Sequence, residues 1–367
     1  MSAFAFPPPP REVEALLDKA FSGERLHFEE GLRLLAGAPF LDLGQAADAA
    51  RARKHPDGVV TYIVDRNINY TNVCVANCTF CAFYRKPGDA EGYVLPMNEL
   101  LQKIRETVEL GGTGILLQGG HNPQLPFSFY EEMLATFRRE FPQVHLHAFS
   151  PPEITFFSKL YKMPLSEVIA RLKTAGLMSI PGGGAEILSD EVRKDMARGK
   201  ATVKEWLAVM REAHRQGLRT TATMMFGSIE SPRDILIHLQ HIRDLQDETG
   251  GFTAFIPWTF QPGETTPLQE ATATGVDYLR VLALSRIFLD NFDNVQASWV
   301  TQGLKMGQVA LHFGANDMGS IMIEENVVAS AGCRNATNEA ELRRLISDAG
   351  FIPRKRRTLY EPAEEQG

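Results

Sequence analysis

The sequence predicts an α/β protein, built as a (β/α)₈ barrel of the TIM type with a helical N-terminal extension and a C-terminal tail. Short β-branched and aromatic segments alternate with amphipathic helical segments from residue 59 to about residue 320. Successive strands lie roughly 30–40 residues apart, so each connection returns the chain along the sheet and the strands pair in parallel. Eight such units fit the usual length of a closed barrel, about 250 residues. An open doubly wound sheet is the competing architecture.

The elements follow from the period of the apolar residues. Residues 11–20, 27–37 and 43–55 carry apolar residues at three- and four-residue spacings and are predicted helices. The period then changes, and residues 59–64 form the first predicted strand. The later predicted strands are residues 113–118, 144–149, 176–180, 219–226, 252–258, 295–299 and 312–316. The predicted helices between them are residues 97–110, 129–141, 165–175, 202–216, 232–248, 276–290 and 302–311.

The chain is expected to divide into three parts. Residues 1–57 form the helical extension, residues 58–330 the barrel, and residues 331–367 a C-terminal helix and tail that pack on the barrel. The basic run from Arg354 to Arg357 near the end of the chain is expected to be a solvated surface feature.

Composition excludes several classes of protein. The chain has 367 residues, with 38 Lys and Arg against 45 Asp and Glu and a formal charge of −7, which disfavours a general nucleic-acid binder. Its apolar stretches are shorter than the roughly 18–20 residues that cross a bilayer, so no membrane role is expected. The N-terminus does not resemble a secretory signal. Four cysteines are too few for a disulfide scaffold, and this favours a reducing, cytoplasmic compartment.

Three of the cysteines form the most informative motif. Cys74, Cys78 and Cys81 make a C-x₃-C-x₂-C run after the first predicted strand. Structural zinc prefers four ligands, and no fourth cysteine or histidine is nearby in sequence. A [4Fe–4S] cluster also takes four cysteines, so three thiolates leave one iron open for chemistry. The motif therefore predicts an iron–sulfur cluster, whereas Cys333 is interpreted as an ordinary loop residue.

This motif resembles that of the radical S-adenosylmethionine superfamily. The resemblance implies that the open iron binds S-adenosylmethionine, which is cleaved to methionine and a 5′-deoxyadenosyl radical. Phe80 matches the aromatic position beside the cofactor. Gly119 and Gly120, after the second predicted strand, resemble the glycine-rich segment that holds the methionine amine, and Gly227 matches the adenine-contacting segment.

Further candidates lie at other strand ends, because a barrel places its active site at the carboxyl ends of its strands. Ser150 and Glu186 are candidate cofactor-binding residues. Glu153 and Asp317 are candidate catalytic residues that contact substrate hydroxyls, although each could equally be a helix cap. His147 is a candidate for proton transfer if its face of the strand points inward, and a hydrogen-bonded core histidine is the alternative.

Over residues 25–360 the chain resembles the family of cyclic dehypoxanthine futalosine synthases, through residues 66–74, 118–123, 150–154, 180–187, 314–317 and 322–326. The resemblance implies cyclisation of dehypoxanthine futalosine in menaquinone biosynthesis, with an external flavodoxin or ferredoxin as electron donor. Aminofutalosine synthase and the deazaflavin-forming enzymes are alternatives within the superfamily. A barrel metallo-hydrolase using His145 and His147, or a pure electron carrier, would be a different class of protein.

Overall fold

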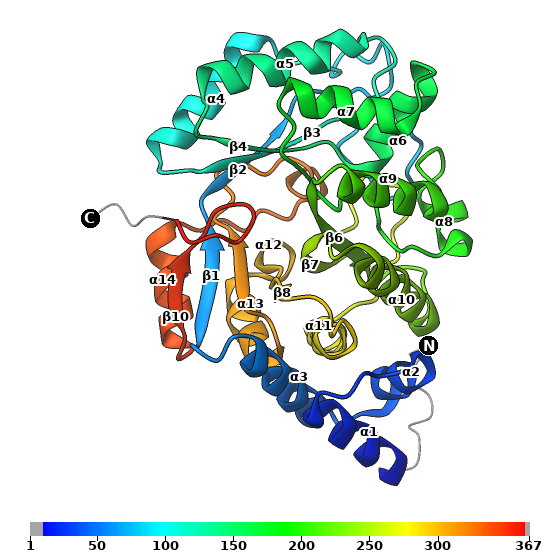
Figure 1. The fold of residues 1–367 in the computed structure, drawn as a ribbon. Helices are drawn as coiled ribbons and strands as arrows, with labels where there is room; N and C mark the ends of the chain where they lie inside the picture. The colour runs from blue at the N-terminus through cyan, green and yellow to red at the C-terminus, as the bar shows by residue number, and fades with distance from the viewer. Residues whose placement is uncertain (1–9, 364–367) are drawn as a thin grey trace.

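A computed structural model describes residues 10–363 and contains a curled sheet of seven parallel strands (Figure 1). The strands follow one another in chain order, and each pairs in parallel with the next. They are β2 (Asp65–Asn69), β3 (Gly114–Gln118), β4 (His145–Ala148), β5 (Ser179–Ile180), β6 (Arg219–Phe226), β7 (Phe252–Thr259) and β8 (Asn294–Val295). The predicted parallel α/β architecture is therefore confirmed.

A second sheet brings the two edges of the first together. Strand β1 (Val59–Ile63) lies between β9 (Asp317–Ser320) and β10 (Ile352–Lys355), with both neighbours parallel. A bridge between Gln296 and Asp317 joins the end of β8 to β9. Because β2 follows β1 almost directly, residues 59–69 act as one strand that pairs with β9 in its first half and with β3 in its second. This arrangement is the predicted TIM-type barrel.

Helices surround the sheet on its outer face (Figure 1). They are α4 (Met97–Glu109), α5 (Phe127–Glu140), α7 (Leu165–Ala175), α9 (Val203–Arg215), α10 (Pro232–Thr249) and α11 (Gly275–Phe288). The N-terminal α1 (Pro10–Ser22), α2 (Phe28–Gly37) and α3 (Phe40–Lys54) lie beside α11 and bury Leu34, Leu43 and Ala47 completely. None of the described helices is both long and apolar enough to cross a membrane.

Several elements at the carboxyl ends of the strands were not predicted from the sequence. Two short helices, α6 (Pro151–Leu160) and α8 (Asp190–Met196), follow β4 and β5. The short helix α12 (Trp299–Gln302) and the 3₁₀ turns η1 (Leu311–Phe313) and η2 (Ala329–Ala331) were not predicted either. Helix α13 (Leu304–Ala310) lies within the predicted helix at residues 302–311, and α14 (Glu339–Asp348) lies in the C-terminal part, where a helix was expected.

The predicted strand at residues 312–316 is wrong in its position. Residues 311–313 form η1, and Gly314, with φ of 100°, turns the chain before β9 begins at Asp317. The predicted strand at residues 295–299 is likewise too long, because β8 ends at Val295 and Trp299 begins α12.

The basic run near the C-terminus was also interpreted wrongly. Residues up to Lys355 belong to β10, which pairs with β1. Arg356 is only 5% exposed, and its guanidinium donates to both carboxylate oxygens of Asp317 at 2.6 and 2.9 Å. A buried carboxylate requires a cation of this kind, whereas Arg354 and Arg357 are exposed as predicted.

Candidate active site

The three cysteines lie in a loop between β2 and α4 that is anchored by backbone hydrogen bonds on several sides. The backbone N–H of Cys74 donates to the carbonyl of Arg85 at 2.8 Å, and that of Val75 donates to the carbonyl of His121 at 3.0 Å. Further along the loop, Thr79 N–H donates to the carbonyl of Met196 at 3.0 Å. The backbone that carries the thiols is therefore anchored to α8 and to the loop after β3.

The chemistry of these thiols fits an iron–sulfur cluster. All three are free and line one cavity. The described residues contain no trio of His, Cys, Asp or Glu side chains close enough to hold a single metal ion. A set of three thiols facing a cavity instead suits a larger cluster with one iron left open. Cys333 donates to the carbonyl of Val300 and does not line this cavity.

Two glycines allow the chain after β3 to approach the cysteine loop. A Cβ on Gly120 would lie 2.3 Å from the carbonyl oxygen of Val73, and one on Gly119 would lie 2.5 Å from the ring of Tyr70. Both contacts are impossible for a larger residue, so these positions require glycine. Gly119 and Gly120 line the cavity, as the sequence predicted for a ligand-contacting segment.

Ser150 and Glu153 form the start of α6 and are connected to the same loop. Ser150 caps the helix, and the Glu153 carboxylate accepts from the Ser150 N–H and hydroxyl, each at 2.7 Å. The same carboxylate accepts from the Gly119 N–H at 3.0 Å and the Tyr70 hydroxyl at 2.7 Å. Burial raises the pKa of Glu153, although these hydrogen bonds oppose the shift. Glu153 thus links α6 to the Gly119 backbone, and both side chains line the cavity.

A partly buried ion pair between Lys200 and Glu186 lines the same cavity. Lys200 Nζ lies 2.7 Å from Glu186 Oε1 and 5.1 Å from the centre of the Phe80 ring. Glu186 Oε2 is buried without a hydrogen-bond partner, and Arg193 is 3.9 Å away. All of these except Arg193 line the cavity. The unpartnered carboxylate oxygen is suited to accept from hydroxyl or ammonium groups of a ligand.

The inner walls of the barrel are unusually polar. Asp65, Asn67 and Asn69 alternate along β2, and all three line the cavity. Pairing across the sheet places Asn67 level with Leu116, His147 and Ser179 on the next three strands. Typical barrels fill these layers with branched apolar residues, so the polar lining leaves room for a polar ligand.

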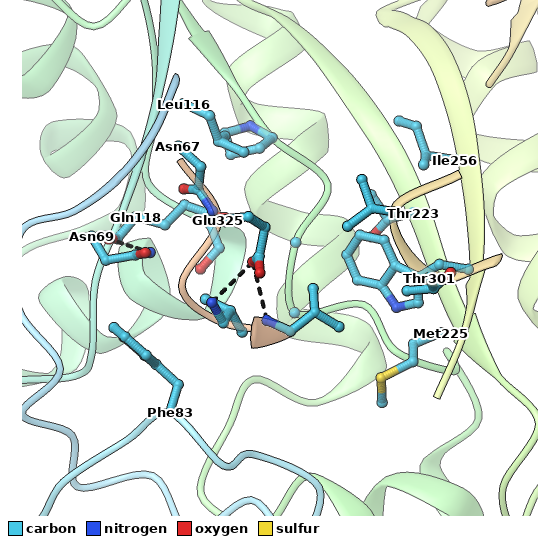
Figure 2. Close-up of a pocket in the computed structure, with 18 of the residues that line it drawn as sticks. Asn67, Asn69, Phe83, Leu116, Gln118, Thr223, Met225, Ile256, Thr301 and Glu325 are labelled. Atoms are coloured by element: carbon cyan, nitrogen blue, oxygen red, sulfur yellow. Dashed lines mark hydrogen bonds between the residues drawn. The ribbon is translucent and has the colours of Figure 1, made fainter. Parts of the chain in front are cut away.

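The cavity has a volume of about 410 Å³. Figure 2 shows Asn67, Asn69 and Gln118 on one side, with Thr223, Met225, Ile256 and Thr301 on the other. Glu325 reaches between them from the loop after β9, where its carboxylate accepts from backbone N–H groups of residues 327–329. The cavity therefore has an amide-rich wall facing a largely apolar wall.

The predicted candidates that do not line the cavity are Asp317 and Gly227. Asp317 is fully buried at the closure of the barrel, where it pairs with Arg356 and accepts from the Gly319 N–H at 2.8 Å. Gly227 forms a turn after β6, and its N–H donates to Glu230. Their predicted roles remain predictions.

Sequence reasoning missed Lys200, Asn67, Asn69 and Gln118. The alternating polar residues of β2 were a usable signal, because a strand whose polar residues recur every second position presents them on one face. Lys200 had no such signal, since it follows α8 in a segment with no regular period.

Comparison with known protein families agrees with this geometry. Residues 68–242 match the radical SAM superfamily, and residues 249–366 match the CofH/MqnC C-terminal region. The first match spans the three cysteines and the strand ends that surround them. The chain belongs to the radical SAM superfamily. It is therefore an enzyme of the radical S-adenosylmethionine type, a group whose members hold an iron–sulfur cluster.

Curated relatives within this superfamily carry several names. The chain is 44% identical to cyclic dehypoxanthine futalosine synthase of Halalkalibacterium halodurans, covering 95% of this chain and 94% of the relative. It is 41% identical to 5-amino-6-(D-ribitylamino)uracil–L-tyrosine 4-hydroxyphenyl transferase 1 of Methanosarcina barkeri, covering 97% and 95%. It is 39% identical to aminodeoxyfutalosine synthase of Thermus thermophilus, covering 94% of each chain.

Among solved structures, the crystal structure of methylornithine synthase shares the fold. The TM-score is 0.72 at 18% sequence identity, covering 92% of this chain and 97% of that one. Nearly the whole barrel and its flanking helices are therefore common to the two proteins.

Proposed function

We propose that this radical SAM enzyme converts dehypoxanthine futalosine into its cyclic form in menaquinone biosynthesis. The observation that carries the proposal is the 44% identity, over 95% of the chain, to a protein named cyclic dehypoxanthine futalosine synthase. The free thiols of the cysteine loop are consistent with work in a reducing compartment such as the cytoplasm. The electron is proposed to come from an external flavodoxin or ferredoxin.

In this proposal Cys74, Cys78 and Cys81 would hold a [4Fe–4S] cluster, which would supply the reductive cleavage of S-adenosylmethionine to methionine and a 5′-deoxyadenosyl radical. The hydrogen at C4′ of the substrate ribose would then be transferred to 5′-deoxyadenosine. The resulting carbon radical adds to the benzoate ring, and loss of an electron and a proton restores aromaticity. The protein must hold the reacting atoms together and exclude other C–H groups and water.

The lining of the cavity suits these tasks. Gly119 and Gly120 bring backbone groups to the methionine end of S-adenosylmethionine, while Glu153 fixes the Gly119 N–H by hydrogen bonding. The unpartnered oxygen of Glu186 accepts from ligand hydroxyl or ammonium groups, and Lys200 balances its charge. These residues would position S-adenosylmethionine beside the cysteine loop.

The opposite end of the cavity suits the substrate. Asn67 Oδ1 is buried without a hydrogen-bond partner and can accept from a ribose hydroxyl. The amide N–H groups of Gln118 and Asn69 are donors for the carboxylate of the benzoate. The facing wall, which includes Ile256 and Met225, offers apolar surface to the aromatic ring.

The test is a product assay on anaerobically reconstituted protein with S-adenosylmethionine, dithionite and dehypoxanthine futalosine carrying deuterium at C4′. We expect deuterium in 5′-deoxyadenosine and a product that is lighter than the labelled substrate by one deuterium and one hydrogen. Cys78→Ala should abolish both, whereas the matched variant Cys333→Ala should retain them, because Cys333 lies outside the cavity.

The same assay separates the alternatives. Turnover of only the enolpyruvyl ether of 3-hydroxybenzoate would indicate aminofutalosine synthase, as in the relative from Thermus thermophilus. Turnover of only tyrosine with the ribitylaminouracil would indicate the transferase reaction of the relative from Methanosarcina barkeri. Either result would overturn the proposed substrate.

The metallo-hydrolase alternative is disfavoured by the geometry of its two histidines. His145 Nε2 and His147 Nδ1 both lie against the Ser179 hydroxyl, at 2.7 and 2.6 Å, and only His147 lines the cavity. The two rings are therefore connected through a serine and do not converge on a point that a substrate can reach.

A further inference from the structure

Two histidines and a serine form a continuous chain of hydrogen bonds from the cavity toward the amino end of the barrel. His147 and His145 lie two residues apart on β4, and Ser179 lies beside His147 on β5. Ser179 Oγ is 2.6 Å from His147 Nδ1 and 2.7 Å from His145 Nε2. Ser179 is fully buried, His147 lines the cavity, and His145 does not.

The single hydroxyl proton of Ser179 couples the two rings. When Ser179 donates to one imidazole it must accept an N–H from the other, so the tautomers of the two histidines change together. Burial lowers the pKa of His147 to about 3 and that of His145 to about 4, so both rings are neutral near pH 7. Among residues 10–363, no other protein group hydrogen-bonds to the second nitrogen of either ring.

One of the two coupled states presents a base to the cavity. In that state the Ser179 hydroxyl donates to His145 Nε2, and His147 Nδ1–H donates to Ser179. His147 Nε2 then carries a lone pair on the side of the ring away from Ser179. A proton taken up at Nε2 can be balanced by release of the Nδ1 proton to Ser179, whose own proton passes to His145.

We propose that His147, Ser179 and His145 are a proton relay for the step that restores the aromatic ring, an inference that rests on the proposed function. The C–H bond at the newly bonded ring carbon breaks, its proton goes to His147 Nε2, and its electron pair returns to the ring. The Nδ1 proton moves to Ser179 and the Ser179 proton to His145 Nε2. The ring radical anion then loses one electron to an oxidised iron–sulfur centre, which leaves a neutral aromatic product.

The position of His145 explains why three groups are needed. His145 pairs with Gly114 in the layer of the barrel below His147, and its ring is partly exposed. A proton delivered there leaves the cavity that holds the radical and can be released to solvent. His147 is thus the catalytic residue, and Ser179 and His145 act through it.

Another titratable group faces the same part of the cavity. Asp65 lines it, and burial raises the pKa of its carboxyl. Arg356 also lines it but is bound to Asp317, and its charge lowers the pKa of His147. Asp65 is therefore the rival proton acceptor that the experiment must distinguish.

The test compares the amount of 5′-deoxyadenosine with the amount of cyclic product in variants of the reconstituted enzyme. In Ser179→Ala and His145→Gln, deuterium transfer from C4′ should continue, while the ratio of 5′-deoxyadenosine to cyclic product rises about 10-fold or more. The solvent deuterium isotope effect on product formation should also change. Ser179→Thr, which keeps the hydroxyl, should restore the wild-type ratio.

A matched control removes a similar hydroxyl elsewhere. His214 Nε2 lies 2.7 Å from the Thr220 hydroxyl, outside the cavity, so Thr220→Val should leave the product ratio unchanged. Nitrogen-15 NMR of the histidine rings in the unreconstituted protein gives a second measurement, in which Ser179→Ala should shift the tautomer ratios of both His145 and His147.

A wild-type ratio of 5′-deoxyadenosine to cyclic product in both Ser179→Ala and His145→Gln would overturn the relay. The relay would also be overturned if this ratio rose in Asp65→Asn and in neither of the other two variants. If the proposed function is wrong, the wild-type enzyme itself makes no cyclic product. The NMR measurement still tests the coupled tautomers in that case, so the two failures are distinguishable.

Discussion

Replacing Arg356 by methionine should destabilise the protein strongly, because it would leave a buried carboxylate without its cation. The Asp317 carboxylate is fully buried and accepts from Arg356 Nε at 2.6 Å and Nη2 at 2.9 Å. The guanidinium also lies 4.0 Å from the centre of the Tyr360 ring. Breaking a buried pair by removing one partner costs about 3–5 kcal/mol.

The assay is urea unfolding of Arg356→Met at pH 7.5, followed by circular dichroism. Arg354→Met is the matched control, because Arg354 lies two residues away in β10, its side chain is 47% exposed and it is 3.7 Å from Asp57. Exposed pairs contribute about 0–1 kcal/mol, so the control should unfold close to wild type. In the double variant Arg356→Met with Asp317→Asn, the loss should be smaller than the sum of the two single losses. Equal free energies of unfolding for Arg356→Met and Arg354→Met would refute the reasoning.

Three further predictions concern the site itself. Gly120→Ala should lower the iron bound per chain after reconstitution, because its Cβ would lie 2.3 Å from a backbone carbonyl oxygen. The control Gly58→Ala, whose Cβ would have nothing within 4 Å, should bind iron normally. Equal iron content in the two variants would contradict this prediction. Lys200→Met should weaken S-adenosylmethionine binding to the reconstituted enzyme about 10-fold or more, as measured by calorimetry. The control Lys204→Met, at an exposed lysine, should leave the affinity unchanged. An unchanged affinity in Lys200→Met would show that Lys200 does not contribute to the binding site. Burial lowers the pKa of His147 to about 3, whereas an unfolded histidine has a pKa of about 6.5. Between these values the unfolded chain binds more protons than the folded protein, so the free energy of unfolding should fall as the pH decreases below about 6.5. His147→Gln should reduce the slope of the free energy of unfolding against pH by up to about 1.4 kcal/mol per pH unit, and an unchanged slope would argue against a buried neutral ring.

The barrel itself could be predicted from sequence because its longer elements have strong periods. Helix α7 coincides with the predicted residues 165–175, and β6 with the predicted residues 219–226. Strand β9 was misplaced because Asp317–Ser320 lacks the β-branched residues that mark strands, and its place is set by pairing with β1. The helix α6 was not predicted, although its two initial prolines suit the first turn of a helix and Ser150 caps it.

The site was predictable only where local chemistry was distinctive. The cysteine spacing and the glycines after β3 stand out in the sequence, and the structure places both beside one cavity. Lys200 and Arg356 were not found, because each of these cations is identified by the carboxylate that it pairs with in space. Glu186 is 14 residues from Lys200, and Asp317 is 39 residues from Arg356.

The pairing of β10 with β1 affects how the chain folds during its synthesis. Val59 pairs with Ile352, and Arg356, Thr358 and Tyr360, which follow β10, line the cavity. During translation, the side of β1 that pairs with β10 stays unpaired until β10 itself has left the ribosome. A nascent chain that stops before β10 would thus have an open sheet edge and an unfinished cavity, which makes such a chain a ready target for chaperones and proteases.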